Sequence, residues 1–180
     1  RAIPTILETF NTGLSKISKK DREKEERTDR DLPMLVVIGG AVVLGICLWL
    51  VLSFWTATEI RIIPNLLVAF IMVIFSFFFV TVSSRIVGLI GSSSNPVSGM
   101  TITTLLLTSL IFSLMGWTSD AHMVIALSVG AVVCISIAIA GDTSQDLKTG
   151  FLVGATPWKQ QIGEFIGVLT SAIFVGWVIL

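Results

Sequence analysis

The sequence predicts an all-α integral membrane protein, a polytopic helical bundle with interrupted helices. Of its 180 residues, 53% are hydrophobic and only 13% are charged. Its mean hydropathy is +0.91, well above that of soluble domains of similar size. Several uncharged runs reach about 20 residues, the length that a helix needs to cross the hydrocarbon core of a bilayer. We therefore expect a multi-pass protein of the cell (inner) membrane, in contact with lipid.

Most of the charge lies near the start of the chain. Seven of the twelve basic residues and six of the twelve acidic residues fall between Lys16 and Asp31. Such a run of mixed charge is typical of a solvated loop or a short surface helix, with a docking tail as the alternative. We therefore divide the chain into a charged cytoplasmic loop, residues 1–32, and a transmembrane helical region, residues 33–180. The remainder offers no basic surface for nucleic acid.

Five helices are expected in the transmembrane region. Pro33 suits the first turn of a helix, and Asn95 followed by proline has the form of a cap and a helix start. The expected helices comprise residues 34–56, 63–90, 96–116, 122–153 with a bend near 141, and 157–180. The chain begins without Met and stops within an apolar run, so we expect a fragment of a longer protein.

The basic residues also predict the orientation. If residues 1–32 are cytoplasmic and four crossings follow, eleven of the twelve Lys and Arg residues lie on the cytoplasmic side. Only Arg61 lies outside. Because short cytoplasmic segments carry an excess of Lys and Arg, this distribution favours that orientation.

Two polar segments, residues 91–99 and 141–161, interrupt the apolar runs. In each, a polar residue, Asn95 or Thr156, precedes a proline that opens the next helix. The first-turn amide groups of these helices would be unpaired, an arrangement that suits an anion or a carboxylate. Paired interruptions of this kind point to the binding site of a transporter. The alternative is that both are ordinary turns at the membrane surface.

The first polar segment is followed by a stripe of hydroxyl groups. Ser98, Thr101, Thr104 and Thr108 recur at steps of three and four and so lie on one arc of a helix. Such hydroxyls most often bond to their own backbone or to a neighbouring helix, and lining a solute path is the less common use. The candidate substrate-path residues are Ser94, Asn95, Pro96, Ser98, Gly99, Thr101 and Thr104.

The second polar segment contains charges. If residues 142–151 are helical, Asp142, Gln145 and Asp146 share one face and Lys148 points elsewhere. Two carboxylates four residues apart disfavour joint ionisation, so one of them could hold a proton if desolvated. This pattern predicts proton coupling, and a solvated cytoplasmic loop is an equal alternative. The candidate proton-coupling residues are Asp142, Gln145, Asp146 and Lys148.

No motif indicates an enzyme. A serine nucleophile would lack an evident base, and no acidic or histidine cluster has the spacing of metal ligands. Cys47 and Cys134 lie in apolar runs and are interpreted as small hydrophobic residues. We expect no catalytic residue, no metal site and no cofactor.

Two stretches resemble the signatures of a known family. They are Asn-Pro-Val-Ser-Gly-Met-Thr at residues 95–101 and Gly-Asp-Thr-Ser-Gln-Asp-Leu-Lys-Thr-Gly at residues 141–150. Gly-Ala-Thr-Pro at 154–157, Gln-Gln at 160–161 and Asp-Leu-Pro-Met at 31–34 are also similar. In this order they resemble the oligopeptide transporter family, which includes the yellow-stripe-like metal-chelate carriers and their bacterial relatives. Ser144 departs from the pattern, since an apolar residue such as Met is expected there.

The resemblance implies a secondary active transporter that imports short peptides or metal chelates together with protons. It agrees in helix order over residues 30–180, implies more spanning helices than this chain contains, and does not extend to the charged loop. A small solute and protons would be the partners, and a homo-oligomer is left open. The alternative function is a channel with a re-entrant Gly-Ser-Asn-Pro loop.

Overall fold

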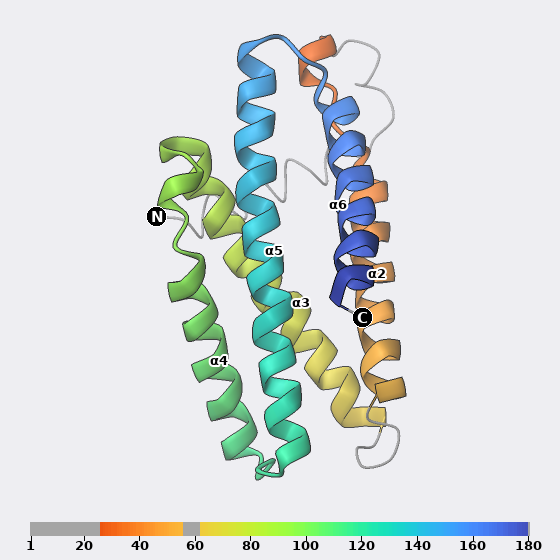
Figure 1. Cartoon of the computed structure of the whole chain (residues 1–180), viewed down its shortest axis with the longest axis vertical. Coiled ribbons are helices and arrows are strands. Elements are labelled where there is room, and N and C mark those ends of the chain that lie inside the picture. The colour runs from red at the N-terminus through yellow and green to blue at the C-terminus, as the bar shows by residue number, and fades with distance from the viewer. Residues whose placement is uncertain (1–25, 56–61, 180) are drawn as a thin grey trace. The chain divides into compact units, whose positions relative to one another are not determined.

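The computed structural model describes residues 26–55 and 62–179. Within these residues the regular structure is entirely helical (Figure 1), which confirms the predicted all-α class. The elements are η2 (Arg27–Asp29), α2 (Met34–Trp55), α3 (Ile62–Ile90), η3 (Ser92–Ser94), α4 (Val97–Leu114), α5 (Asp120–Leu152) and α6 (Pro157–Ile179).

Five of these helices are long and apolar enough to cross a membrane: α2, α3, α5, α6, and α4 together with η3. The 29 residues of α3 extend over about 44 Å, and the 33 residues of α5 over about 50 Å, at a rise of about 1.5 Å per residue. A hydrocarbon core is only about 30 Å thick, so both helices must tilt or continue beyond it. The polytopic architecture predicted from the apolar runs is confirmed.

The chain divides into two compact units. The terminal unit combines Arg1–Ile38 with Thr143–Leu180, and its described part contains η2, the end of α5 and α6. The central unit, Gly39–Asp142, contains α3, η3, α4 and most of α2 and α5. The first polar segment therefore lies in the central unit, and nearly all of the second lies in the terminal unit.

The core of the central unit is formed by residues that recur every three or four positions. On α5 the buried residues of this core are Ile125, Ala126, Val129, Val133 and Ile137. On α4 the buried residues are Met100, Thr104, Thr108 and Phe112. Residues at these spacings share one face of a helix. Each helix thus has a defined inner face, although apolar side chains cover both its inner and outer faces.

Two of the helices end at a glycine in the left-handed conformation. Gly116 after α4 and Gly154 after α5 both have a φ of 73°, which favours glycine because it lacks a Cβ. In both cases the N–H of the following residue donates to the carbonyl five positions earlier, at 2.8 Å. This Schellman arrangement pairs carbonyl groups that a helix end leaves free. It fixes where the α4–α5 and α5–α6 turns begin.

The helix α5 is continuous through Gly141 and ends at Leu152. Only residues 153–156 separate it from α6, so most of the second polar segment is helical. The bend near residue 141 and the division into a cytoplasmic loop and a transmembrane region stay predictions.

The helices α4 and α5 are in close contact at Gly130. A Cβ at this position would lie 2.8 Å from Leu105 Cγ, a separation at which the leucine would have to move. Small residues at such positions let membrane helices approach closely. Gly130 therefore sets the spacing of this helix pair.

We predict that Gly130→Val destabilises the full-length protein by about 1 to 3 kcal/mol, because the added side chain overpacks the contact with Leu105. The measurement is thermal unfolding in detergent. Ala131→Val, at the exposed neighbouring position, is the matched control and should have little effect. Combining Gly130→Val with Leu105→Ala should recover part of the loss, since residues in contact couple. An unchanged unfolding temperature for Gly130→Val would contradict the contact.

Candidate functional site

The first polar segment forms a tight connection between α3 and α4. Gly91 has a φ of 110°, the three serines of η3 make one 3₁₀ turn, and Asn95 is extended. Pro96 occupies the cap position of α4, which begins at Val97. We expected Asn95 to cap this helix through its side chain. No side-chain cap bond forms, because the Asn95 amide is engaged elsewhere.

The Asn95 side chain connects this segment to two helices of the central unit. Its Oδ1 accepts a hydrogen bond from Ser83 Oγ of α3 at 2.9 Å. Its Nδ2 donates to the Ile137 carbonyl of α5 at 3.4 Å, and Ser83 Oγ also lies 3.0 Å from that carbonyl. Ser83 is fully buried, where an unpaired polar group would be costly. Asn95 therefore holds α3, α5 and the start of α4 together.

Gly141 provides the space for this amide. A Cβ at Gly141 would overlap the Asn95 amide nitrogen and would lie 3.3 Å from Val87 Cγ2. One residue earlier on α5, the Ala140 carbonyl accepts a hydrogen bond from Ser84 Oγ at 3.4 Å. Gly141 is thus a packing position within a continuous helix, at the point where the polar segment begins.

The hydroxyl stripe of α4 runs from an exposed end at Ser98 to the buried Thr104 and Thr108. Thr101 Oγ1 donates to the Val97 carbonyl at 2.8 Å, and Thr104 Oγ1 donates to the Met100 carbonyl at 2.9 Å. Thr104 is fully buried, and Ser98 is exposed. The hydroxyl groups of Thr101 and Thr104 thus bond to their own helix, which is the more common use of such groups. Of the substrate-path candidates, the exposed ones are Ser94, Pro96, Ser98 and Gly99.

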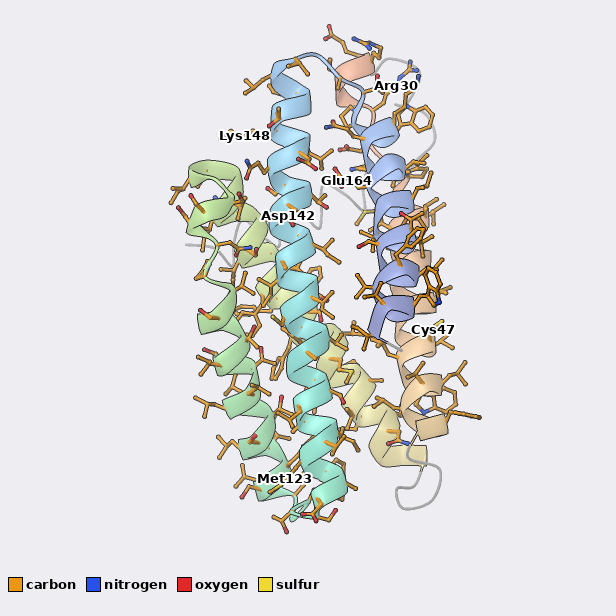
Figure 2. All side chains as sticks on the ribbon, viewed as in Figure 1. Arg30, Cys47, Met123, Asp142, Lys148 and Glu164 are labelled. Carbon is orange, nitrogen blue, oxygen red and sulfur yellow. The ribbon has the colours of Figure 1, made fainter. Side chains whose placement is uncertain are left out.

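The four proton-coupling candidates lie on the last third of α5. Asp142, Gln145, Asp146 and Lys148 are all exposed, and Figure 2 labels Asp142 and Lys148 on this helix. Their roles, like those of the substrate-path candidates, stay predictions. Within the described residues, no group of three or more His, Cys, Asp or Glu could hold a metal ion.

The terminal unit contains an arrangement that we call the amino-terminal clamp, formed by residues 27–32 and residues 154–161. Arg27 makes two of its contacts. The Arg27 guanidinium donates from Nη2 to the Gly154 carbonyl at 2.7 Å and from Nη1 to Thr156 Oγ1 at 3.4 Å. A bond from a charged donor is stronger than one between neutral groups. The described part of the charged segment is thus bonded to the turn between α5 and α6. The sequence predicted a solvated loop or a short surface helix, with a docking tail as the alternative.

The rest of the clamp uses the start of α6. The Arg30 carbonyl accepts from the Trp158 N–H at 3.1 Å, so this first-turn amide is paired, contrary to our expectation. Gln161 makes two contacts: its Oε1 accepts from the Leu32 N–H at 3.1 Å, and its Nε2 donates to Asp31 Oδ1 at 3.5 Å. Residues more than 120 positions apart in the sequence are thereby joined.

Next to the clamp, the end of α5 and the start of α6 pair as an antiparallel hairpin. Gln160 Nε2 donates to the Asp146 carbonyl at 2.8 Å, and the Gln160 side chain fills the space left by Gly150. Further from the turn, the Thr143 hydroxyl is a hydrogen-bond partner of Glu164. Polar side chains therefore connect the two helices over about two turns of α5.

Sequence reasoning missed two residues of this arrangement. Arg27 is one of seven basic residues in a charged run, and nothing local distinguishes it from the others. Glu164 is the single charged residue between Ile162 and Leu180. A lone carboxylate in an apolar run of membrane length is a signal of function that could have identified it.

We predict that Arg27→Ala loosens the clamp. Removing a hydrogen bond from a charged donor costs about 1.5 to 3 kcal/mol, so the Leu32 and Trp158 amides should exchange their hydrogens about 10 to 100 times faster. The measurement is hydrogen exchange followed by mass spectrometry on the full-length protein. Glu26→Ala, at the exposed preceding residue, is the control. Equal exchange in wild type and Arg27→Ala would show that the clamp does not depend on Arg27.

Comparison with known proteins identifies the family. A family model described as "OPT oligopeptide transporter protein" matches residues 2–180. The chain is 33% identical over 126 residues to a Haemophilus influenzae protein named "Putative oligopeptide transporter", an alignment that covers 65% of this chain and 20% of that protein. No solved structure matches the chain. The family match includes both polar segments and the clamp, and it confirms the resemblance seen in the sequence. The chain therefore belongs to the OPT oligopeptide transporter family.

Proposed function

We propose that the protein is a secondary active transporter that imports short peptides or metal chelates together with protons. The observation that carries this proposal is the family match over residues 2–180. Five helices that could cross a membrane agree with it. The chain covers 20% of the length of the relative that it matches, so the solute and the coupling ion are inferences about the whole protein.

Within the first polar segment, we assign solute contact to the exposed residues. These are Ser94, Pro96, Ser98 and Gly99. Thr101, Asn95 and Thr104 direct polar groups to protein partners, so we assign them the role of holding the segment in place. A rigid scaffold that positions a polar connection is how binding residues are commonly presented.

The clamp supports the proposed orientation. Residues 27–32 bond to residues 154–161, and we infer that both segments lie on the same membrane face. This requires an even number of crossings between them, and the four helices α2 to α5 supply it. The excess of basic residues on this face then favours a cytoplasmic location for both segments. We propose that the clamp is the cytoplasmic end of this part of the transporter.

The length of α5 supports a wet location for the proton-coupling candidates. Counted from Asp120, about 20 residues cover the hydrocarbon core, and the remaining residues 141–152 extend about 18 Å further. Asp142 and Asp146 would then reach the aqueous phase at the inner mouth of the solute path. Protons that enter with solute could leave there, driven by about 1.4 kcal/mol per pH unit and about 2.3 kcal/mol per 100 mV.

One observation favours a transporter over the channel alternative. In a re-entrant pore loop, polar groups line the lumen. Here the Asn95 amide is bonded to α3 and α5, and the Gly-Ser-Asn-Pro segment connects two successive helices. A channel would also pass solute without saturation, whereas a transporter saturates.

We predict saturable, pH-dependent uptake of peptide or metal chelate by the full-length protein in liposomes. Asp142→Asn or Asp146→Asn should weaken the dependence of uptake on an imposed pH gradient, because each removes a group that could exchange the coupling proton. Asp120→Asn, at the other end of α5, is the control. Unchanged coupling in both variants, or uptake that never saturates, would contradict this assignment.

A further inference from the structure

Glu164 is a carboxylate on a membrane-length helix, and it lies against the end of α5. Figure 2 shows it on the side of α6 that faces α5. The Thr143 hydroxyl is its hydrogen-bond partner. Its other oxygen, Oε1, is buried and has no hydrogen-bond partner among the described residues.

The charged groups around Glu164 offer it little compensation. From α5, the Asp146 carboxylate interacts with it electrostatically. On its own helix, the ammonium of Lys159 lies over the Trp158 ring, 5.7 Å from its centroid. On the clamp, Asp31 bonds to Gln161, one turn of α6 earlier. Within the described residues, no Lys or Arg forms an ion pair with Glu164.

The surroundings of Glu164 can accommodate both of its protonation states. As an anion it accepts a hydrogen bond from Thr143, but its shielded oxygen lacks a donor, and Asp146 adds a second negative charge. Charges that are buried without a partner are expensive, and neutralisation removes that cost. A hydroxyl group is both a donor and an acceptor, so Thr143 can donate to the carboxylate and can accept from the carboxylic acid.

We propose that Glu164, with Thr143 and Asp146 beside it, is a binding site for a coupling proton. The inference deepens the proposed function and rests on it, because a proton bound at Glu164 is a coupling proton only if the protein is a proton-driven transporter. The step is a simple exchange: a proton from water forms an O–H bond with the Glu164 carboxylate, and release breaks that bond and returns the proton to water. The hairpin between α5 and α6 thereby carries the exchangeable charge.

Proton binding is tested without transport. Infrared difference spectra of the purified full-length protein, recorded for a step between about pH 8 and pH 5, report the C=O stretch of newly formed carboxylic acids. The proposal predicts that Glu164→Gln removes one component of this band. Thr143→Val should shift the frequency of the same component, because it loses a hydrogen bond. Asp120→Asn should retain the component. A band that is identical in wild type and Glu164→Gln overturns the proposal.

Coupling is tested in liposomes with a radiolabelled tetrapeptide as the probe. At equilibrium one coupled proton gives about tenfold accumulation per pH unit. Glu164→Gln should abolish this dependence while downhill uptake continues, and Glu164→Asp, which keeps a carboxylic acid, should retain it. If wild type couples to protons and Glu164→Gln couples equally well, the inference is wrong and the proposed function stands. If wild type takes up the probe without regard to pH, the proposed function fails, and the infrared result still decides whether Glu164 binds a proton.

Discussion

The hydrogen bonds from Arg27 to the Gly154 carbonyl and the Thr156 hydroxyl hold the amino-terminal segment on the turn between α5 and α6. The paired Trp158 amide and both contacts of Gln161 are formed by the same two segments. Backbone groups at helix ends need partners, and here a distant part of the chain supplies them. Residues 27–32 and 154–161 are thereby joined, and we propose that both lie on one membrane face. The proposed orientation rests on this constraint.

In both units a glycine of α5 makes room for an amide side chain. In the central unit, Gly141 of α5 makes room for the Asn95 amide, and in the terminal unit, Gly150 of α5 makes room for the Gln160 amide. In each case an amide side chain from a polar segment bonds to a backbone carbonyl of α5, of Ile137 or of Asp146. In lipid there is no hydrophobic driving force for the association of helices. Hydrogen bonds from amide side chains to a neighbouring helix help to hold the helices together instead. The two polar segments therefore hold helices together, besides any contact that they make with solute.

The helices and the family could be predicted from the sequence because both depend on local patterns. Uncharged runs fix where a helix can cross a membrane, and prolines fix where the next helix begins. The partners of Arg27 and Asn95 could not be predicted, because they lie 127 and 42 positions away in the chain. The packing role of Gly141 could not be predicted either, since its sequence neighbours give no sign of the Asn95 amide that packs on it. Glu164 did carry a local signal, a single carboxylate in an apolar run, but its contact with Thr143 is not visible in the sequence.

The central claim is that residues 27–32 and the α5–α6 turn share one face of the membrane. The most direct test is labelling of single cysteines with a membrane-impermeant maleimide in intact cells and in inside-out vesicles, after Cys47 and Cys134 are replaced. Cysteine is introduced at Glu26, at Val153 and, in the turn between α4 and α5, at Thr118, all of which are exposed. We predict that positions 26 and 153 react only from the cytoplasmic side and position 118 only from the other side. Labelling of positions 26 and 153 from opposite sides would contradict the clamp and the orientation built on it.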